Sequence, residues 1–361
     1  MEPRGASIAR GIAPALLAAV LFGVTTPVIA LAGQDVGALS TAALLYTGAA
    51  LAAFGQRAVF RSRGPGLTTA ALRRVALVAV FGAAIAPTLL AWGLRRTGGT
   101  MGSLLLNLEA VFTVVLARIV HGEMLGRRVI GALALMVVAG ALLAVDAGGA
   151  TAPGTAAGAL AVCLATLGWA VDNTLTRPLS ESDPVLVVGV KGALGAALTA
   201  TLAALLGERA PGLRAALILL GCGATGYGLS LRLYLIAQRR IGVARTGSIF
   251  ALGPFVGAAL GWLLGFREAG LLTGVSAALF GMAVYLHATE RHRHRHRHEA
   301  TDHAHAHAHD DGHHGHTHDP PVVGEHTHPH HHDATEHDHA HVPDLHHLHD
   351  HGPDDEDHHH R

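Results

Sequence analysis

The stretch RRTGGTMGSLLLNLEAVF at 95–112 returns as RRIGVARTGSIFALGPFV at 239–256, an offset of 144 residues. Both copies begin with an arginine pair and continue into an apolar run that is rich in small residues. Leu108 aligns with Leu252, and Glu123 aligns with Glu268 after a slip of one residue. An apolar segment that recurs half a chain later predicts two copies of one membrane-embedded unit.

Ten apolar segments of membrane-spanning length surround these two copies. They lie at 8–31, 38–56, 75–94, 99–120, 128–147, 155–176, 184–206, 214–237, 243–265 and 269–288. Each has about 20 residues, enough to cross a hydrocarbon core of ~30 Å as a helix. Half of the residues are apolar and 14% are charged, which argues against a soluble globular protein. The two cysteines, Cys163 and Cys222, lie deep in apolar runs and exclude a disulfide scaffold. We therefore predict an all-α, polytopic membrane fold.

The spans divide into two groups of five, which we expect at 1–150 and 151–288. Because five is odd, the second group must cross the membrane in the opposite direction, which gives inverted repeats. One alternative concerns the start, where Arg4, Arg10 and the following apolar run also fit a cleaved signal peptide. The repeat favours a first membrane helix instead.

The arginines of the loops predict the orientation of the helices. With the N-terminus in the cytoplasm, 14 arginines fall on inside segments and 5 on outside loops. This asymmetry places both termini in the cytoplasm.

Two stretches, LEAVFTVVLARIVHGE (108–123) and LGPFVGAALGWLLGFRE (252–268), resemble a motif of EamA-type transporters in the drug/metabolite transporter superfamily. The resemblance covers about 8–288. It implies ten helices in two inverted repeats, a central cavity and secondary transport, often outward. Ala110 stands where the first repeat of that family usually has proline, which removes the usual reason for a helix break there.

Four ionisable residues lie inside the predicted spans: Glu109, Asp172, Lys191 and Arg232. Each shares a helical stripe with small or polar residues, which face other helices or a cavity rather than lipid. Two interpretations stand side by side. The charges pair with one another and fix the helix register, or at least one contacts the substrate or carries a coupling proton. Glu109 ranks first because it lies mid-span, whereas Arg232 lies near the cytoplasmic end, where it could snorkel.

Other polar and aromatic residues are weaker candidates for a cavity wall, because packing or interfacial anchoring explains each of them more simply. They are Asn107, Asn173, Trp92, Trp169, Tyr46, Tyr227 and Tyr234. The run GCGATGYG at 221–228 is glycine-dense enough to bend or unwind its helix. The sequence holds neither an ATP-binding loop nor a hydrolytic constellation, so we expect no enzyme and no required cofactor.

The C-terminal tail differs in composition and charge from the rest of the chain. Residues 287–361 hold 28 of the 29 histidines and a net charge of −11, against +11 for 1–286. We expect 289–361 to be a disordered cytoplasmic tail, because it cannot form a core. Imidazole suits Ni, Co and Zn, and we predict metal ligands in the tail. They are His292, His294, His296, His298, His303, His305, His307, His309, His313, His314, His316 and His318. Alternatives are a response to pH and metal binding without a biological role.

Together these observations predict a multi-pass secondary transporter in the inner membrane that exports a small solute. One alternative is a divalent Ni, Co or Zn transporter fed or regulated by the tail. Another, of a different class, is a membrane-anchored metal buffer or sensor. The expected partners are the lipid bilayer, a small-molecule substrate, a divalent metal and a second copy in a homodimer. No nucleic acid is expected.

Overall fold

The computed structural model describes residues 4–60, 66–121, 126–149, 154–176, 179, 182–241, 243–266 and 270–288, and four tail segments at 293–297, 301–307, 326–332 and 336–340. The chain forms two compact units, Met1–Glu290 and Arg291–Arg361. Each unit is described by itself.

All the regular elements described in the first half of the large unit are helices. Its elements are α1 (Arg4–Ala32), α2 (Ala38–Phe60), α3 (Thr69–Val78), the π-helix η1 (Ala79–Ile85), α4 (Ala86–Leu105), α5 (Leu108–His121) and α6 (Arg127–Gly149). α3, η1 and α4 run on without a break until Gly98, whose φ of 73° turns the chain. Only glycine adopts this conformation without strain. The third and fourth predicted spans therefore meet at Gly98.

The second half repeats this order. Its elements are α7 (Thr155–Thr176), α8 (Pro184–Leu205), α9 (Leu213–Cys222), the π-helix η3 (Gly223–Leu229), α10 (Ser230–Ile241), α11 (Val243–Phe250), α12 (Gly253–Leu263) and α13 (Leu271–Ala288). α9, η3 and α10 begin 144 residues after α3, η1 and α4, the offset that the sequence repeat predicts.

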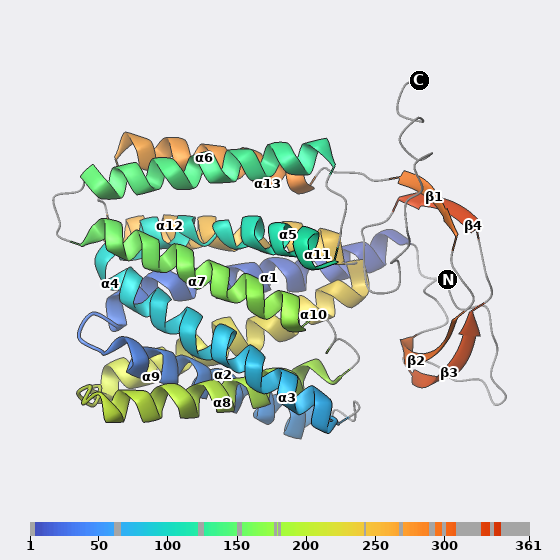
Figure 1. The fold of residues 1–361 in the computed structure, drawn as a ribbon, viewed down its shortest axis with the longest axis horizontal. Coiled ribbons are helices and arrows are strands. Elements are labelled where there is room, and N and C mark those ends of the chain that lie inside the picture. The colour runs from blue at the N-terminus through green and yellow to red at the C-terminus, as the bar shows by residue number, and fades with distance from the viewer. Residues whose placement is uncertain are drawn as a thin grey trace. The chain divides into compact units, whose positions relative to one another are not determined.

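Helices of the two halves pack against one another in matching pairs (Figure 1). α2 packs on α8 and α6 on α13, so that each of these helices contacts its own counterpart. α1 packs on α10, and α7 makes the matching contact with α4. The prediction of an all-α fold with inverted repeats is confirmed.

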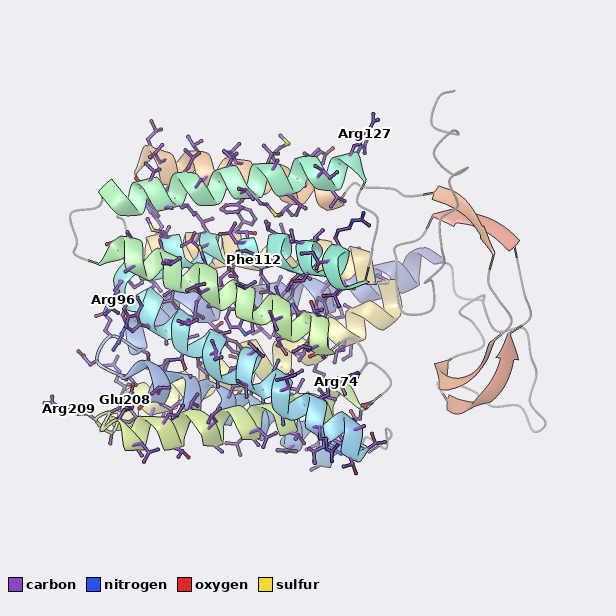
Figure 2. All side chains as sticks on the ribbon, in the orientation of Figure 1. Arg74, Arg96, Phe112, Arg127, Glu208 and Arg209 are labelled. Carbon is purple, nitrogen blue, oxygen red and sulfur yellow. The ribbon has the colours of Figure 1, made fainter. Side chains whose placement is uncertain are left out.

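Many large apolar side chains are exposed on the helices of the bundle, as a lipid environment favours. Among the described residues, seven helices are long and apolar enough to span a membrane, and α12 and α13 are shorter apolar helices. The fourth and ninth predicted spans are interrupted at 106–107 and 251–252. Residues of loops predicted to face the cytoplasm and residues of loops predicted to face outside lie at opposite ends of the bundle. Arg74 and Arg127 lie at one end, and Arg96, Glu208 and Arg209 lie at the other (Figure 2).

The described segments of the tail form four short strands. They are β1 (Arg293–Arg297), β2 (Thr301–His307), β3 (His326–His332) and β4 (Glu336–Ala340). β1 pairs with β4 and β2 with β3, both antiparallel. The sequence predicts disorder here, whereas these segments have strand backbone. Their alternating H-x-H pattern has the two-residue period of a strand.

Candidate functional site

An ion pair joins two of the predicted intramembrane charges. Lys191 Nζ of α8 donates to Asp172 Oδ2 of α7, and both side chains are largely buried. The Thr176 hydroxyl donates to the other carboxylate oxygen of Asp172 at 3.2 Å. α7 and α8 are consecutive helices, so a short connection brings the two charges together. This contact is the arrangement that the ion-pairing interpretation expects, and it brings the opposite charges of Asp172 and Lys191 together.

Glu109 lies in the first turn of α5 and meets the second half of the chain. Asn173 Nδ2, on α7, donates to Glu109 Oε1 at 2.9 Å. The Glu109 carboxylate also lies within electrostatic reach of Asp172 and Lys191. Glu109 is half-buried and Asn173 is exposed, so the cluster runs from the surface of α7 toward its buried face. The structure thus brings four predicted site residues together between α5, α7 and α8.

Beside this cluster, two aromatic side chains converge on one backbone oxygen. Tyr46 Oη donates to the Gly82 carbonyl at 2.5 Å, and Trp169 Nε1 donates to the same oxygen at 3.0 Å. The Asp172 carboxylate packs against the Cα of Gly82, where an added Cβ would collide with it. Residue 82 must therefore be glycine for η1 to approach the ion pair this closely.

Tyr227 of η3 completes an aromatic cluster at the same place. Its ring centroid lies 5.7 Å from that of Tyr46, 6.4 Å from Trp169 and 6.0 Å from Phe22. Rings at these separations attract one another beyond simple burial. Residues from both halves therefore meet around Gly82, beside the Asp172–Lys191 pair.

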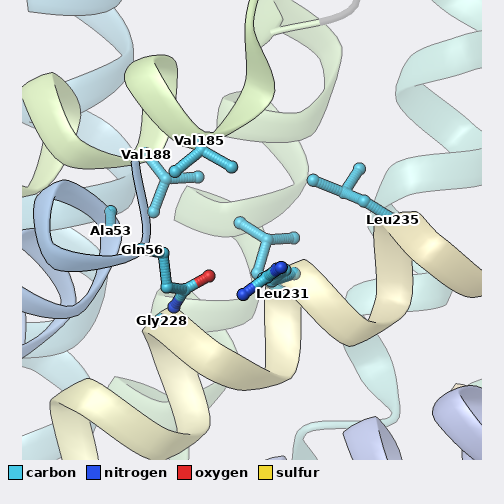
Figure 3. A pocket seen from close by; sticks show the side chains of 8 residues that line it. Ala53, Gln56, Val185, Val188, Gly228, Leu231 and Leu235 are labelled. Atoms are coloured by element: carbon cyan, nitrogen blue, oxygen red, sulfur yellow. The ribbon is translucent and has the colours of Figure 1, made fainter. Parts of the chain in front are cut away.

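Two of the predicted site residues lie elsewhere. Asn107 is buried at the interruption between α4 and α5, and its amide donates to the Leu104 carbonyl at 3.0 Å. It satisfies the backbone of its own turn, which supports a structural role. Arg232 of α10 lines a small pocket with Gln56 of α2 and Val188 of α8 (Figure 3). The pocket has room for about one water molecule.

The predicted metal ligands lie in the tail. The backbone of His294 and His296 belongs to β1, and that of His303, His305 and His307 to β2. The other seven lie outside the described residues; they are His292, His298, His309, His313, His314, His316 and His318. Among the side chains that the structure describes, no group of three His, Cys, Asp or Glu residues could hold a metal ion.

Sequence reasoning missed Gly82 and ranked Tyr46 and Tyr227 low. The run GAAIAP at 82–87 could have pointed to Gly82, because a glycine there precedes a proline by five residues inside a span. Proline within a helix leaves a carbonyl without its backbone donor, and side chains often take that place.

Comparison with known proteins agrees with this architecture. The model of the EamA-like transporter family matches residues 9–145 and 156–289. An "Uncharacterized transporter" from Methanothermobacter thermautotrophicus is 25% identical over 214 residues, covering 58% of this chain and 62% of that protein. The aligned part thus spans less than two thirds of the relative's length.

A solved structure shares the fold. One crystal structure of another protein superposes on this chain with a TM-score of 0.55 at 19% sequence identity. The match covers 79% of this chain and 96% of the other. At this identity the likeness concerns the fold alone.

Proposed function

The chain belongs to the EamA-like transporter family, and we propose that it exports a small organic solute across the inner membrane in exchange for protons carried by Glu109. In this proposal the ten predicted spans, with the arginine-rich loops inside, leave both termini in the cytoplasm. In this proposal Glu109 binds either a proton or the substrate, and the aromatic cluster around Tyr227 forms the adjoining wall.

The observation that carries this proposal is the difference between the two acids of the site. Asp172 is already paired with a positively charged side chain, since Lys191 donates a hydrogen bond to it. The partner described for Glu109 is the neutral amide of Asn173. A carboxylate with a neutral partner can lose or gain a proton without leaving another charge unpaired. Intramembrane carboxylates of this kind serve as proton relays in transporters.

The first experiment is a growth screen, because the substrate class must come before a flux assay. Cells that lack the protein and cells that overproduce it are compared on amino acids, toxic analogues and divalent metals. Resistance to an organic compound on overproduction supports the proposal. A phenotype confined to Ni, Co or Zn would favour the metal-transporting alternative instead.

The second experiment uses the compound that the screen identifies. Purified protein in vesicles that contain a pH-sensitive dye should move protons when the compound is added on one side. Glu109→Gln should abolish the signal, and Asp146→Asn is the matched control. Asp146 accepts a 2.5 Å hydrogen bond from Thr273 and lies in α6, outside the cluster. Equal proton movement in both variants would contradict the role of Glu109.

A further inference from the structure

The two π-helices occupy equivalent places in the two halves. η1 and η3 each have seven residues, and η3 begins 144 residues after η1. A π-helix joins each carbonyl to the N–H five residues later. At the end of η1, Ala86 N donates to the Phe81 carbonyl, and at the end of η3, Ser230 N donates to that of Thr225. These two hydrogen bonds correspond to each other by the 144-residue offset.

The next hydrogen bond in this register differs between the halves. In η3, the residue five positions after Gly226 is Leu231, which carries a backbone N–H. In η1, the residue five positions after Gly82 is Pro87, and proline has no backbone N–H to donate to the Gly82 carbonyl. A buried carbonyl without a donor costs about 1–3 kcal/mol.

Side chains supply the missing donors in the first half. Tyr46 and Trp169 both donate to the Gly82 carbonyl. By the same offset, the counterpart of Trp169 is Thr25, which packs against Gly226. The Thr25 hydroxyl donates instead to the Phe22 carbonyl of its own helix, at 2.6 Å. Pro87 and the compensating donor Trp169 thus occur together at one of the two equivalent places, and neither has a like counterpart at the other.

We propose that Tyr46 and Trp169 are positioning residues that replace the donor missing at Pro87 and fix η1, which leaves η3 as the hinge of the transport movement. A π-helix becomes an α-helix when each backbone N–H exchanges its hydrogen bond to the carbonyl five residues earlier for one to the carbonyl four residues earlier. Leu231 can make this change, whereas Pro87 cannot. η1 is therefore an anchor beside the Asp172–Lys191 pair.

Tyr227 connects the hinge to the anchor. It belongs to η3, and its ring contacts those of Tyr46 and Trp169, the two residues that hold η1. Movement of η3 is thus transmitted to the site. The role of η3 in transport rests on the proposed function, whereas the anchoring of η1 is a property of the folded protein alone.

Amide hydrogen exchange of the full-length protein in lipid nanodiscs tests the proposal without any substrate. Peptides that cover 79–87 should exchange about tenfold more slowly than those that cover 223–231. Tyr46→Phe, which keeps the ring, should speed exchange in 79–87 about tenfold. Tyr227→Phe also loses a hydroxyl and should leave exchange in 79–87 unchanged. Faster exchange in 79–87 than in 223–231 in the wild-type protein would overturn the proposal.

A double-mutant cycle with Pro87→Ala isolates the physical cause. This substitution restores a backbone N–H at position 87, so in its presence Tyr46→Phe should change exchange in 79–87 less than twofold. If Tyr46→Phe folds poorly, Pro87→Ala should restore its yield. An equal effect of Tyr46→Phe in the wild-type and in the Pro87→Ala background would refute compensation for the proline. Since none of these outcomes involves flux, a failure of proton coupling at Glu109 would remain a separate result.

Discussion

Asn173 and Glu109 are hydrogen-bonded at 2.9 Å across the interface between the two halves of the chain. Glu109 comes from the first half and Asn173 from the second, and the neighbour of Asn173, Asp172, holds Lys191. A carboxylate at such an interface is well placed to couple its own occupancy to the relative position of the halves, because any sliding of α5 on α7 must break this bond.

Glu109→Gln is expected to fold and to insert but to lose proton-coupled flux by at least about tenfold. Glutamine keeps an oxygen that can accept from Asn173, so the packing of α5 on α7 survives while the titratable group is lost. Flux is measured between pH 5 and pH 8. Normal flux throughout that range would dismiss Glu109 as the proton carrier, and failure to fold would favour a structural role.

Asp172→Asn should destabilise the protein by about 3–5 kcal/mol, because it leaves Lys191 buried beside a neutral group. The double variant Asp172→Asn with Lys191→Met should be markedly more stable than Asp172→Asn alone, since neither charge then remains. Thermal unfolding in detergent gives both values. Additive losses would show that the two side chains do not act as a pair.

The membrane fold could be predicted from the sequence because spanning length and apolarity leave one helical solution. The glycine run at 221–228 correctly indicated an irregular helix, which the structure gives as η3. The interruption before α5 was not predicted, since Ala110 has replaced the usual proline. α4 nevertheless ends at Leu105, and the Asn107 amide caps the Leu104 carbonyl.

The pairing within the site was beyond sequence reasoning. Helical stripes show which face a residue lies on, but they do not show which helix that face meets. The sequence predicts that Asp172 and Lys191 each lie on a small-residue stripe, and their contact depends on how α7 and α8 turn relative to each other. The tyrosine at 46 ranked low for the same reason: its hydrogen-bond partner is a backbone atom of a distant helix.

Glu208 should stabilise the fold at neutral pH by capping α2. Its carboxylate accepts from Ser40 Oγ at 2.6 Å, Ser40 N at 2.8 Å and Leu39 N at 3.2 Å. Desolvation raises the pKa of Glu208, but the hydrogen bonds from Ser40 and Leu39, with the nearby charge of Arg95, outweigh it and lower the pKa. The group binds its proton more weakly in the folded protein than in the unfolded chain.

The stabilisation by Glu208 is therefore present above its unfolded pKa of about 4.3 and is lost as the pH falls through the lower folded value. Glu208→Gln should cost about 0.5–1 kcal/mol at pH 7. This difference in the free energy of unfolding should vanish near pH 3, and Arg209→Gln should show no such trend. A cost that is constant between pH 7 and pH 3 would contradict the charge-based cap.

Gly257→Ala should destabilise the crossing of α12 over α1 and α4 by about 1–3 kcal/mol. A Cβ at this position would lie 2.6 Å from Ser103 Oγ and 2.7 Å from the Gly23 carbonyl oxygen. Gly274→Ala in α13 is the matched control, because a Cβ there meets nothing within 4 Å. The control should be neutral or should gain up to about 1 kcal/mol from helix propensity. Thermal unfolding compares them, and equal stabilities would show that the crossing can relax.

Truncation after Thr289 separates the solute carrier from a metal carrier. It removes 27 of the 29 histidines but none of the membrane helices, so the unit Met1–Glu290 should fold with its internal hydrogen bonds intact. The full-length protein should bind Ni²⁺ or Zn²⁺ through the tail, and this binding should collapse between about pH 7 and pH 5 as imidazole takes up protons.

The two functions predict different losses of flux on this truncation. In a solute carrier, flux of the organic compound stays at the wild-type level and only the metal bound per protein falls. In a carrier fed by its tail, metal flux falls most at low metal concentration, where capture is limiting, and recovers at saturation. Isothermal titration of Ni²⁺ and vesicle flux measure the two quantities on the same preparation. If truncation changed neither bound metal nor flux, the predicted histidine ligands would have no part in metal handling by this protein.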